Sequence, residues 1–278
     1  MKGRRIQNPG AATWSVDAIP YDRVDRTAVC DDEQLFYVIA SASFVEITSD
    51  LFTRSLIGLF EDDDEVVTWL RDSWEPEELQ HGEALKRYVQ VVWPEFDWES
   101  TYREFLGEYT PRCAPELLAP TRALEMAARC VVETGTASFY RMLAESTREP
   151  VLKLIASNIR TDEVRHYKHF FHAFERYRAA EGTGRAAVLR ALLAEMAEID
   201  SEDGYFAFKY VFQARNPGRP FDQRDYAAYR ERIRDLARKF FPTDSAIKML
   251  LKPLGLPALA SRLLLPPVAA ATRLLVLR

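Results

Sequence analysis

The pattern Glu-x-x-His occurs twice in the chain, and no other feature constrains the fold as strongly. The first copy contains Glu78 and His81, and the second contains Glu163 and His166. Residues three apart lie on one face of an α-helix, so each copy can direct a carboxylate and an imidazole toward the same point. The chain has only four histidines, and two of them belong to this pattern. The sequence therefore predicts two helices that each present an acid and a histidine to a common partner.

Two further glutamates lie in apolar segments that precede the two pairs. Glu46 precedes the first pair and Glu133 precedes the second, with gaps of 32, 52 and 30 residues between successive elements. A buried carboxylate without a partner is very costly, so both glutamates need a reason to be there. Two antiparallel helical hairpins joined by a longer crossover would give this spacing. We therefore predict an all-α protein in which a four-helix bundle, with additional flanking helices, surrounds two metal ions. The alternative is that the pairs are ordinary Glu/His pairs on the surface.

The predicted ligand set indicates the kind of metal. Carboxylates with one imidazole per metal suit iron or manganese, whereas zinc sites favour thiolates and more imidazole. Glu78 and Glu163 occupy equivalent places in the two halves, so we expect them to bridge the metals, with Glu46 and Glu133 each bound to one metal. The complete predicted set is Glu46, Glu78, His81, Glu133, Glu163 and His166. Two iron ions are expected, with manganese as a substitute.

Two more acids directly precede the motif glutamates. A metal-bound histidine usually donates its second N–H to an acid or a carbonyl. Asp162 and Glu77 are each placed to reach the histidine of the opposite pair. His169 and His172 continue along the same predicted helix, but the helical turn carries them away from the metal face, and we interpret them as ordinary polar residues.

The composition indicates a helical protein with a packed core. Hydrophobic residues make up 47% of the 278 residues, and only 11 are glycine. Three cysteines without close spacing fit a reducing compartment, and the basic start is followed by no apolar run typical of a signal peptide. Since no long uninterrupted apolar stretch suggests a membrane span, a cytoplasmic protein is predicted. We expect an irregular N-terminal arm (1–30), a helical bundle domain (31–245) and an apolar, basic C-terminal tail (246–278).

Apolar periodicity and helix-capping residues predict the helices. Pro76 is expected to kink the second helix or to open a fresh turn. The approximate bounds of the predicted helices are 31–60, 65–92, 94–109, 121–144, 149–180, 185–214 and 222–241.

Charge is unevenly distributed along the chain. Residues 205–278 contain 14 Lys/Arg and 5 Asp/Glu, whereas residues 1–204 contain 23 and 37. This asymmetry suggests that the C-terminal third meets an acidic partner, although nothing indicates nucleic acid. Residues 254–278 are rich in Leu, Ala and Val and carry arginines. They could contact a membrane surface peripherally, or they could pack their apolar side on the bundle, which is the interpretation we prefer.

Two stretches resemble the signatures of a known family. The segments Trp74-Glu75-Pro76-Glu77-Glu78-Leu79-Gln80-His81-Gly82 and Asp162-Glu163-Val164-Arg165-His166 are similar to the two motifs of the soluble acyl-ACP desaturases, which belong to the ferritin-like di-iron carboxylate proteins. The family also has a threonine three residues after the third helix's glutamate, next to the oxygen-binding position, and here that place is Thr136. The resemblance covers about residues 31–175. We take Thr136, Asp162 and Glu77 as candidate catalytic residues.

The resemblance implies an oxygen-dependent di-iron oxidase, most simply a desaturase that acts on a long acyl chain carried as a thioester. The expected partners are acyl carrier protein or acyl-CoA and a ferredoxin-like or flavin-dependent electron donor, and a homodimer is expected. Other activities on the same scaffold remain open, namely a hydroxylase, an N-oxygenase, an aldehyde-processing oxygenase or a non-catalytic iron-binding protein. The radical-bearing subunit of ribonucleotide reductase fits less well, because Leu85 stands where that subunit has its tyrosine.

Overall fold

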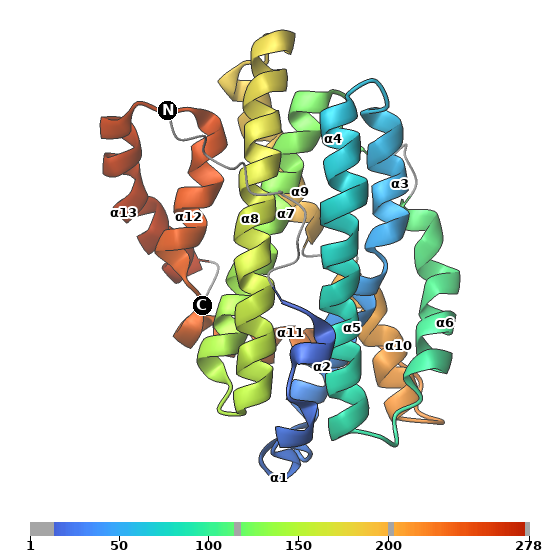
Figure 1. Ribbon diagram of the computed structural model, residues 1–278. Helices are drawn as coiled ribbons and strands as arrows, with labels where there is room; N and C mark the ends of the chain where they lie inside the picture. The colour runs from blue at the N-terminus through green and yellow to red at the C-terminus, as the bar shows by residue number, and fades with distance from the viewer. Residues whose placement is uncertain (1–13, 114–117, 200–202, 276–278) are drawn as a thin grey trace, which may run out of the picture.

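The computed structural model describes residues 14–113, 118–199 and 203–275, and within these ranges every regular element is helical (Figure 1). The prediction of an all-α protein is therefore confirmed. The α-helices are α1 (Arg26–Val29), α2 (Glu33–Ile47), α3 (Ser49–Leu59), α4 (Asp64–Trp69), α5 (Glu75–Val92), α6 (Trp98–Tyr109), α7 (Arg122–Ser146), α8 (Pro150–Glu181), α9 (Arg185–Ile199), α10 (Asp203–Arg215), α11 (Gln223–Phe240), α12 (Thr243–Leu251) and α13 (Ala258–Leu275). Short helical segments are η1 (Val16–Ala18), η2 (Tyr21–Arg23), the π-helical η3 (Leu70–Trp74), η4 (Thr110–Cys113) and η6 (Lys252–Leu254).

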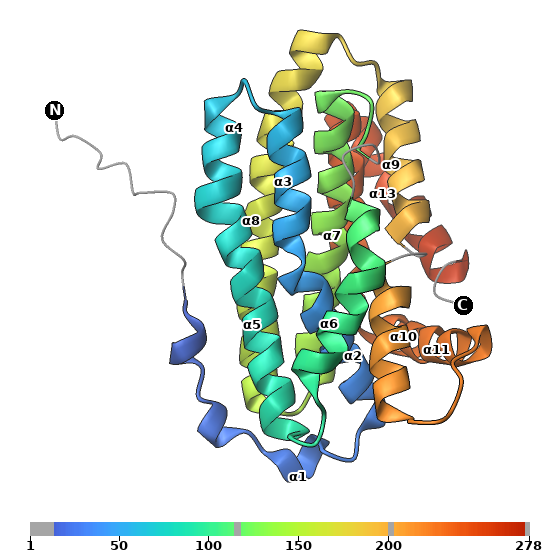
Figure 2. The same cartoon turned by 90° about the vertical axis from the view of Figure 1, so that its right-hand side faces the viewer.

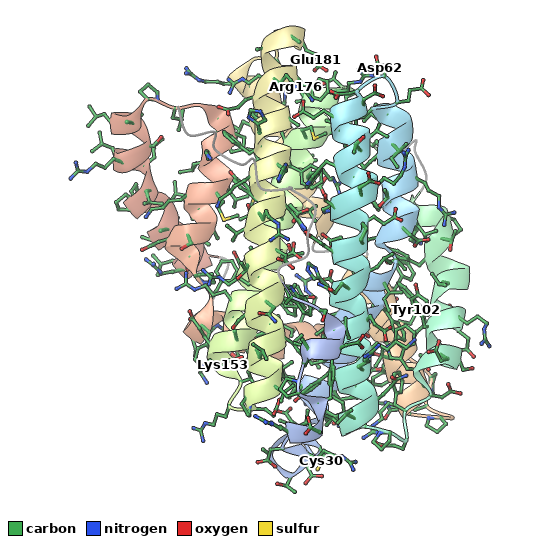
Figure 3. All side chains as sticks on the ribbon, in the orientation of Figure 1. Cys30, Asp62, Tyr102, Lys153, Arg176 and Glu181 are labelled. Carbon is green, nitrogen blue, oxygen red and sulfur yellow. The ribbon has the colours of Figure 1, made fainter. Side chains whose placement is uncertain are left out.

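Two helical hairpins form the centre of the molecule. The first contains α2 and α3 followed by α4 and α5, and the second contains α7 and α8 (Figures 1 and 2). α2 packs along α5, α7 packs along α8, and α5 contacts α8 across the middle. α8 is the longest element and runs from near Lys153 at one end of the molecule to Glu181 at the other (Figure 3). The predicted pairing of antiparallel helices is thus present.

Side chains at the helix ends explain where the central helices begin and stop. Asp32 accepts a hydrogen bond from the backbone N–H of Leu35 at the start of α2, and Thr121 does the same for Leu124 at the start of α7. These side chains satisfy N–H groups that have no partner in the first turn. α8 ends at Gly182, whose positive φ of 66° suits a residue without a Cβ.

The helix predicted at 31–60 is divided at Thr48. The Thr48 hydroxyl donates to the carbonyl of Val45 at 2.6 Å, and such bonds to the preceding turn bend helices. The next predicted helix contains the π-helical turn η3 just before Pro76. Proline has no N–H and crowds the carbonyl four residues earlier, so a widened turn accommodates it without ending the helix.

Two apolar clusters fill the interior, one on each side of a polar middle layer. Along α8, Ile159 belongs to one cluster and Tyr167 to the other, while the buried polar Glu163 lies between them. Along α7 the same order holds, because Val131 and Tyr140 belong to different clusters. Hydrophobic burial on both sides therefore fixes the helices that carry the polar layer.

Peripheral helices complete the fold. α6 and α10 cover α2, and α9 and α12 lie against α7. The helix predicted at 185–214 corresponds to the two helices α9 and α10, and residues 200–202 lie outside the described part. The helix predicted at 222–241 corresponds closely to α11. The predicted break at 111–120 includes residues 114–117, which are also outside the described part.

The C-terminal tail differs from the preferred expectation that it packs on the bundle. α12 does pack, since Ala246 and Ile247 are buried. α13 instead leans on α12 and lies outermost on that side of the molecule (Figure 1), with Leu259 69% exposed and Leu263 66% exposed. Pro266 and Pro267 lie inside this helix rather than breaking it. Arg278 lies outside the described residues.

The described part of the N-terminal arm, residues 14–30, has short helical turns and lies against α5 on the outside of the central helices (Figure 2). Tyr21 donates a hydrogen bond to the carbonyl of Ala84, and Ile19 and Val29 are buried. Residues 1–13, which include the basic start, lie outside the described residues. Residues 14–30 thus belong to the packed structure although their sequence lacks helical periodicity.

One helical stretch in the described residues, Glu33–Leu59, is long and apolar enough to cross a membrane by length and composition alone. It consists of α2 and α3, and 56% of its most apolar window is buried inside the protein. That burial is typical of a core helix in a soluble protein.

Gly82 allows α5 to approach the end of α2. A Cβ on Gly82 would lie 2.4 Å from Cγ1 of Ile47 and 2.7 Å from its backbone nitrogen. The backbone contact cannot be relieved by a side-chain rotation, so the helices would have to separate. Since His81 and Glu46 are the neighbouring residues, this close approach also sets the distance between two predicted ligands.

We expect Gly82→Ala to lower the free energy of unfolding by about 1–3 kcal/mol, because overpacking forces the backbone to shift. Chemical denaturation measures the change. Gly107→Ala is the matched control, since no atom lies within 4 Å of a Cβ built on this glycine of α6. Alanine there should raise stability by about 0.5–1 kcal/mol. A Gly82→Ala protein as stable as the control would mean that α2 and α5 are not held in close contact.

Candidate metal centre

The structure brings all six predicted ligands together in the polar middle layer. One residue comes from α2, two from α5, one from α7 and two from α8. Their side chains form two overlapping groups that could each hold a metal ion, with candidate ligand atoms within 4.8 Å of one another. The first group is Glu46, Glu78, His81 and Glu163, and the second is Glu78, Glu133, Glu163 and His166. Glu78 and Glu163 belong to both groups, as expected of bridging carboxylates.

Each imidazole turns its Nδ1 atom toward the carboxylates. Nδ1 of His81 lies 3.1 Å from Oε1 of Glu163, 3.6 Å from Oε2 of Glu46 and 3.7 Å from Oε2 of Glu78. Nδ1 of His166 lies 2.9 Å from Oε1 of Glu78. It also lies 3.6 Å from Oε2 of Glu133 and 4.0 Å from Oε2 of Glu163. The six residues thus converge on one compact region from two sides.

The outer nitrogen of each histidine contacts an acid from the opposite pair, as the sequence predicts. Nε2 of His81 lies 3.2 Å from Oδ2 of Asp162, and Nε2 of His166 lies 2.7 Å from Oε2 of Glu77. Arg165 forms ion pairs with both acids, at 2.6 Å from Glu77 and 2.9 Å from Asp162. This network holds both rings so that Nδ1 faces inward.

Hydroxyl and indole groups bind the carboxylates from outside the cluster. Thr136 donates to Oε2 of Glu163 at 2.6 Å, which is the position that the sequence assigned to it near the cluster. The Tyr140 hydroxyl donates to Oε1 of Glu46, and the Trp74 indole N–H donates to Oε1 of Glu133 at 3.1 Å. The two terminal carboxylates are therefore each oriented by one aromatic donor.

Two side chains that contact this network, Tyr140 and Trp14, were missed by the sequence analysis. Tyr140 follows Glu133 by seven residues and Thr136 by four, so helical spacing alone could have placed it on the metal face. Trp14 donates its indole N–H to Oδ2 of Asp162 at 2.7 Å and stacks parallel to His81, with 6.1 Å between ring centroids. No local pattern in the arm could have indicated this contact, because it depends on how the arm folds back over the helices.

Burial and mutual contact shift the pKa values of the cluster. Burial raises the pKa of Glu46 to about 7 and raises the pKa values of Glu133 and Glu163 above their usual range. Burial also disfavours the ionised form of Glu78, but the neighbouring imidazoles of His166 and His81 outweigh it and hold its pKa below the usual range. For His81, burial lowers the pKa, but the surrounding carboxylates outweigh this effect and raise it well above the usual value. The cluster therefore carries protons that a cation would displace.

The donor set fits a pair of divalent cations. Four inner-side atoms are buried without a hydrogen-bond partner, namely Nδ1 of His81, Nδ1 of His166, Oε2 of Glu133 and Oε1 of Glu163. Buried polar atoms are rarely left unpaired, and such atoms need an explanation. Four ionised carboxylates with two neutral imidazoles carry the charge that two divalent cations would balance, so the buried cluster would become neutral overall. A single cation would leave negative charge buried at high cost.

Comparisons with known proteins give no further assignment. No protein-family model matches the chain, and no curated protein or solved structure matches it.

Metal binding should depend on pH through the neutral range. A carboxyl must lose its proton and a histidine must be neutral to bind a metal ion. Because burial raises the pKa of Glu46 to about 7, protons compete with the metal below this pH. We expect the affinity for Mn²⁺ to rise with pH and protons to be released on binding. Calorimetry in buffers of different protonation enthalpy measures that release. Glu46→Gln cannot titrate and should release fewer protons, and equal release from both proteins would contradict the role of Glu46.

Asp162→Asn should weaken metal binding without unfolding the protein. The change keeps the shape of the side chain but removes the charge that faces His81 and Arg165. Loss of such a partner typically costs about 10–100-fold in metal affinity or activity. Competition with a coloured chelator measures the affinity. Asp32→Asn at the start of α2 is the matched control, because asparagine caps helices as well as aspartate does. Equal affinities in the two variants would show that the Asp162–His81 contact does not support the site.

Proposed function

We propose that the protein is an oxygen-dependent di-iron oxidase of the ferritin-like type, and that it desaturates a long acyl chain carried as a thioester. One observation carries the proposal, which is that Glu78 and Glu163 belong to both candidate metal groups. Shared carboxylates hold two metal ions next to each other, whereas a storage or structural site can function with a single metal ion. Carboxylate-rich donors favour iron or manganese over zinc, and the two sequence motifs favour iron.

When bound, the iron pair would supply the reduction of oxygen and the removal of hydrogen from an unactivated CH₂ group. The protein's own residues prepare the site for this chemistry. Asp162 and Glu77 fix the imidazoles through Nε2. Thr136 holds a hydroxyl against the shared Glu163, where it can keep or deliver a proton. Apolar clusters on both sides exclude water from the layer.

The substrate and partners follow from the resemblance to acyl-ACP desaturases. Such a reaction consumes two electrons per turnover, and a ferredoxin-like or flavin-dependent protein would supply them. An acyl carrier protein is strongly acidic and CoA carries phosphates, so the basic C-terminal third is the proposed docking region. In α11, however, Arg234 and Arg238 form ion pairs with acids of the same helix. These ion pairs weaken the positive electrostatic field that the two arginines would present to an acidic carrier.

A second candidate is oxygenation of a smaller substrate by the same centre. A hollow of about 40 Å³ between α4 and α8 is lined in part by Trp69 and His169 and by none of the six candidate ligands. Trp69 stacks on His169 and contacts the ring of His166 edge-on, with 6.3 Å between centroids. A hollow of this size admits little more than a water molecule, so it favours neither substrate, and a hydroxylase or N-oxygenase acting on a compact molecule stays an alternative.

The metal content and the product test the proposal together. We expect two irons per chain, and we expect Glu78→Ala or Glu163→Ala to lose at least one of them, since each removes a shared ligand. Elemental analysis measures the iron, and Glu104→Ala is the control, because Glu104 is an exposed residue of α6. Mass spectrometry of fatty acids from producing cells should show new double bonds that the Glu163→Ala cells lack. Two irons retained in both variants would contradict the ligand set.

Thr136→Val separates binding from turnover. Valine fills the same space without a hydroxyl, so iron content should stay at two while oxygen consumption becomes uncoupled from product. Tight coupling in this variant would mean that the Thr136 hydroxyl has only a structural role. That role would be its hydrogen bonds to the backbone carbonyls of Val132 and Glu133, both at 3.3 Å. Intact iron content without altered fatty acids in wild-type cells would favour the smaller substrate.

A further inference from the structure

The outermost helix, α13, rests on a single neighbouring helix among the described residues. It packs only on α12 among the described helices with substantial contacts, and Arg273 forms an ion pair with Asp244 at 2.7 Å. Among residues 258–274, Ala269 alone is buried. α13 is thus attached to the protein through α12. α12 is itself bound to α8, because the Tyr167 hydroxyl donates to the carbonyl of Met249 at 2.7 Å.

The exposed side of α13 is apolar along its whole length. At 100° per residue, the exposed Leu, Ala and Pro residues cover an arc of about 160°. They are Leu259, Leu263, Leu264, Pro266, Pro267, Ala270, Ala271 and Leu274. Leu259, Leu263 and Leu274 are 69%, 66% and 54% exposed. Contiguous exposed apolar surface of this kind marks an interaction site.

The charges on α13 itself have one sign, although Arg273 pairs with Asp244 of α12. Residues 245–278 contain five Lys/Arg and no Asp/Glu. Arg262 and Arg273 are both exposed, and the helical spacing places them together along one edge of the apolar arc. Long basic side chains can lie along apolar surface while their charged ends stay in water. An apolar face with cations at its edge matches an anionic lipid surface, with acyl chains below and phosphates above.

Two prolines set the depth at which the helix can lie. Pro266 and Pro267 lack N–H groups, so the carbonyls of Arg262 and Leu263, four residues earlier, receive no helical hydrogen bond from them. Unpaired carbonyls are very costly in hydrocarbon but can bind water or headgroups at the interface. α13 therefore suits a position parallel to the membrane plane rather than across it.

We infer that α13 docks the protein onto the surface of an anionic lipid bilayer. A second copy of the chain would bring the same cationic edge to the contact, whereas a headgroup layer offers the opposite charge along the whole helix. The inference does not depend on the proposed oxidase activity, because it uses no residue of the metal centre.

Vesicle flotation of the full-length protein tests the inference. Wild type should float with phosphatidylcholine vesicles that contain phosphatidylglycerol and should float much less with phosphatidylcholine alone. The double variant Leu259→Asp/Leu263→Asp should bind at least about tenfold more weakly, since it places two charges where apolar side chains enter the lipid. Arg262→Gln should weaken binding only to the anionic vesicles. Circular dichroism and iron content should be unchanged in all three proteins.

The matched control is Leu189→Asp/Leu193→Asp on α9, where two other leucines are 44% and 56% exposed. This variant should bind vesicles as the wild type does. Equal loss of binding in the control would assign the contact to α9 and overturn the inference. A wild type that stays unbound with both lipids would overturn it too. A third result would also overturn the inference: the wild type is a dimer in light scattering, binds no vesicles, and becomes a monomer in the Leu259→Asp/Leu263→Asp variant. A second copy of the chain would then cover the apolar face.

Discussion

The burial of four carboxylates and two imidazoles in one layer is the constraint on which the rest of the structure depends. The free-energy cost of removing that many ionisable groups from water is offset only when they share protons or cations. The helices cannot relax away from the layer, because apolar clusters on both sides hold them. Gly82 brings α5 against Ile47, and so the fold brings together groups that would separate without it. Burying such a cluster lowers the free energy of unfolding, and the packing of the apolar clusters has to offset that loss.

The centre has two similar halves that differ in their outer contacts. Glu46 receives its hydrogen bond from a phenol, that of Tyr140, whereas Glu133 receives one from the indole of Trp74. On the histidine side, Asp162 also accepts from Trp14, which stacks on His81. The two candidate metal positions therefore differ in the donors that surround them. A ligand or oxidant that enters this layer meets different proton donors on its two sides.

Local sequence signals predicted the ligands because each rule that they use acts within one helix. Helical spacing pairs Glu163 with His166, and the cost of burial singles out Glu133. What the sequence could not give depends on contacts between distant segments. Trp14 reaches Asp162 across 148 positions of the chain. The division of the predicted helix at Thr48 arises because the Thr48 hydroxyl competes with backbone N–H groups for the carbonyls of the preceding turn. Helix propensity alone does not decide the outcome of this competition.

The C-terminal hairpin shows why an apolar segment cannot be assigned to a core by composition. Leu259 and Leu263 are as apolar as the fully buried Leu85 and Leu152, yet burial needs a partner surface, and α13 packs on α12 rather than on the central helices. The hydrogen bond from Tyr167 ties α12 to the residue next to His166. The outward-facing α13 is therefore linked through α12 to α8, which carries two of the candidate ligands.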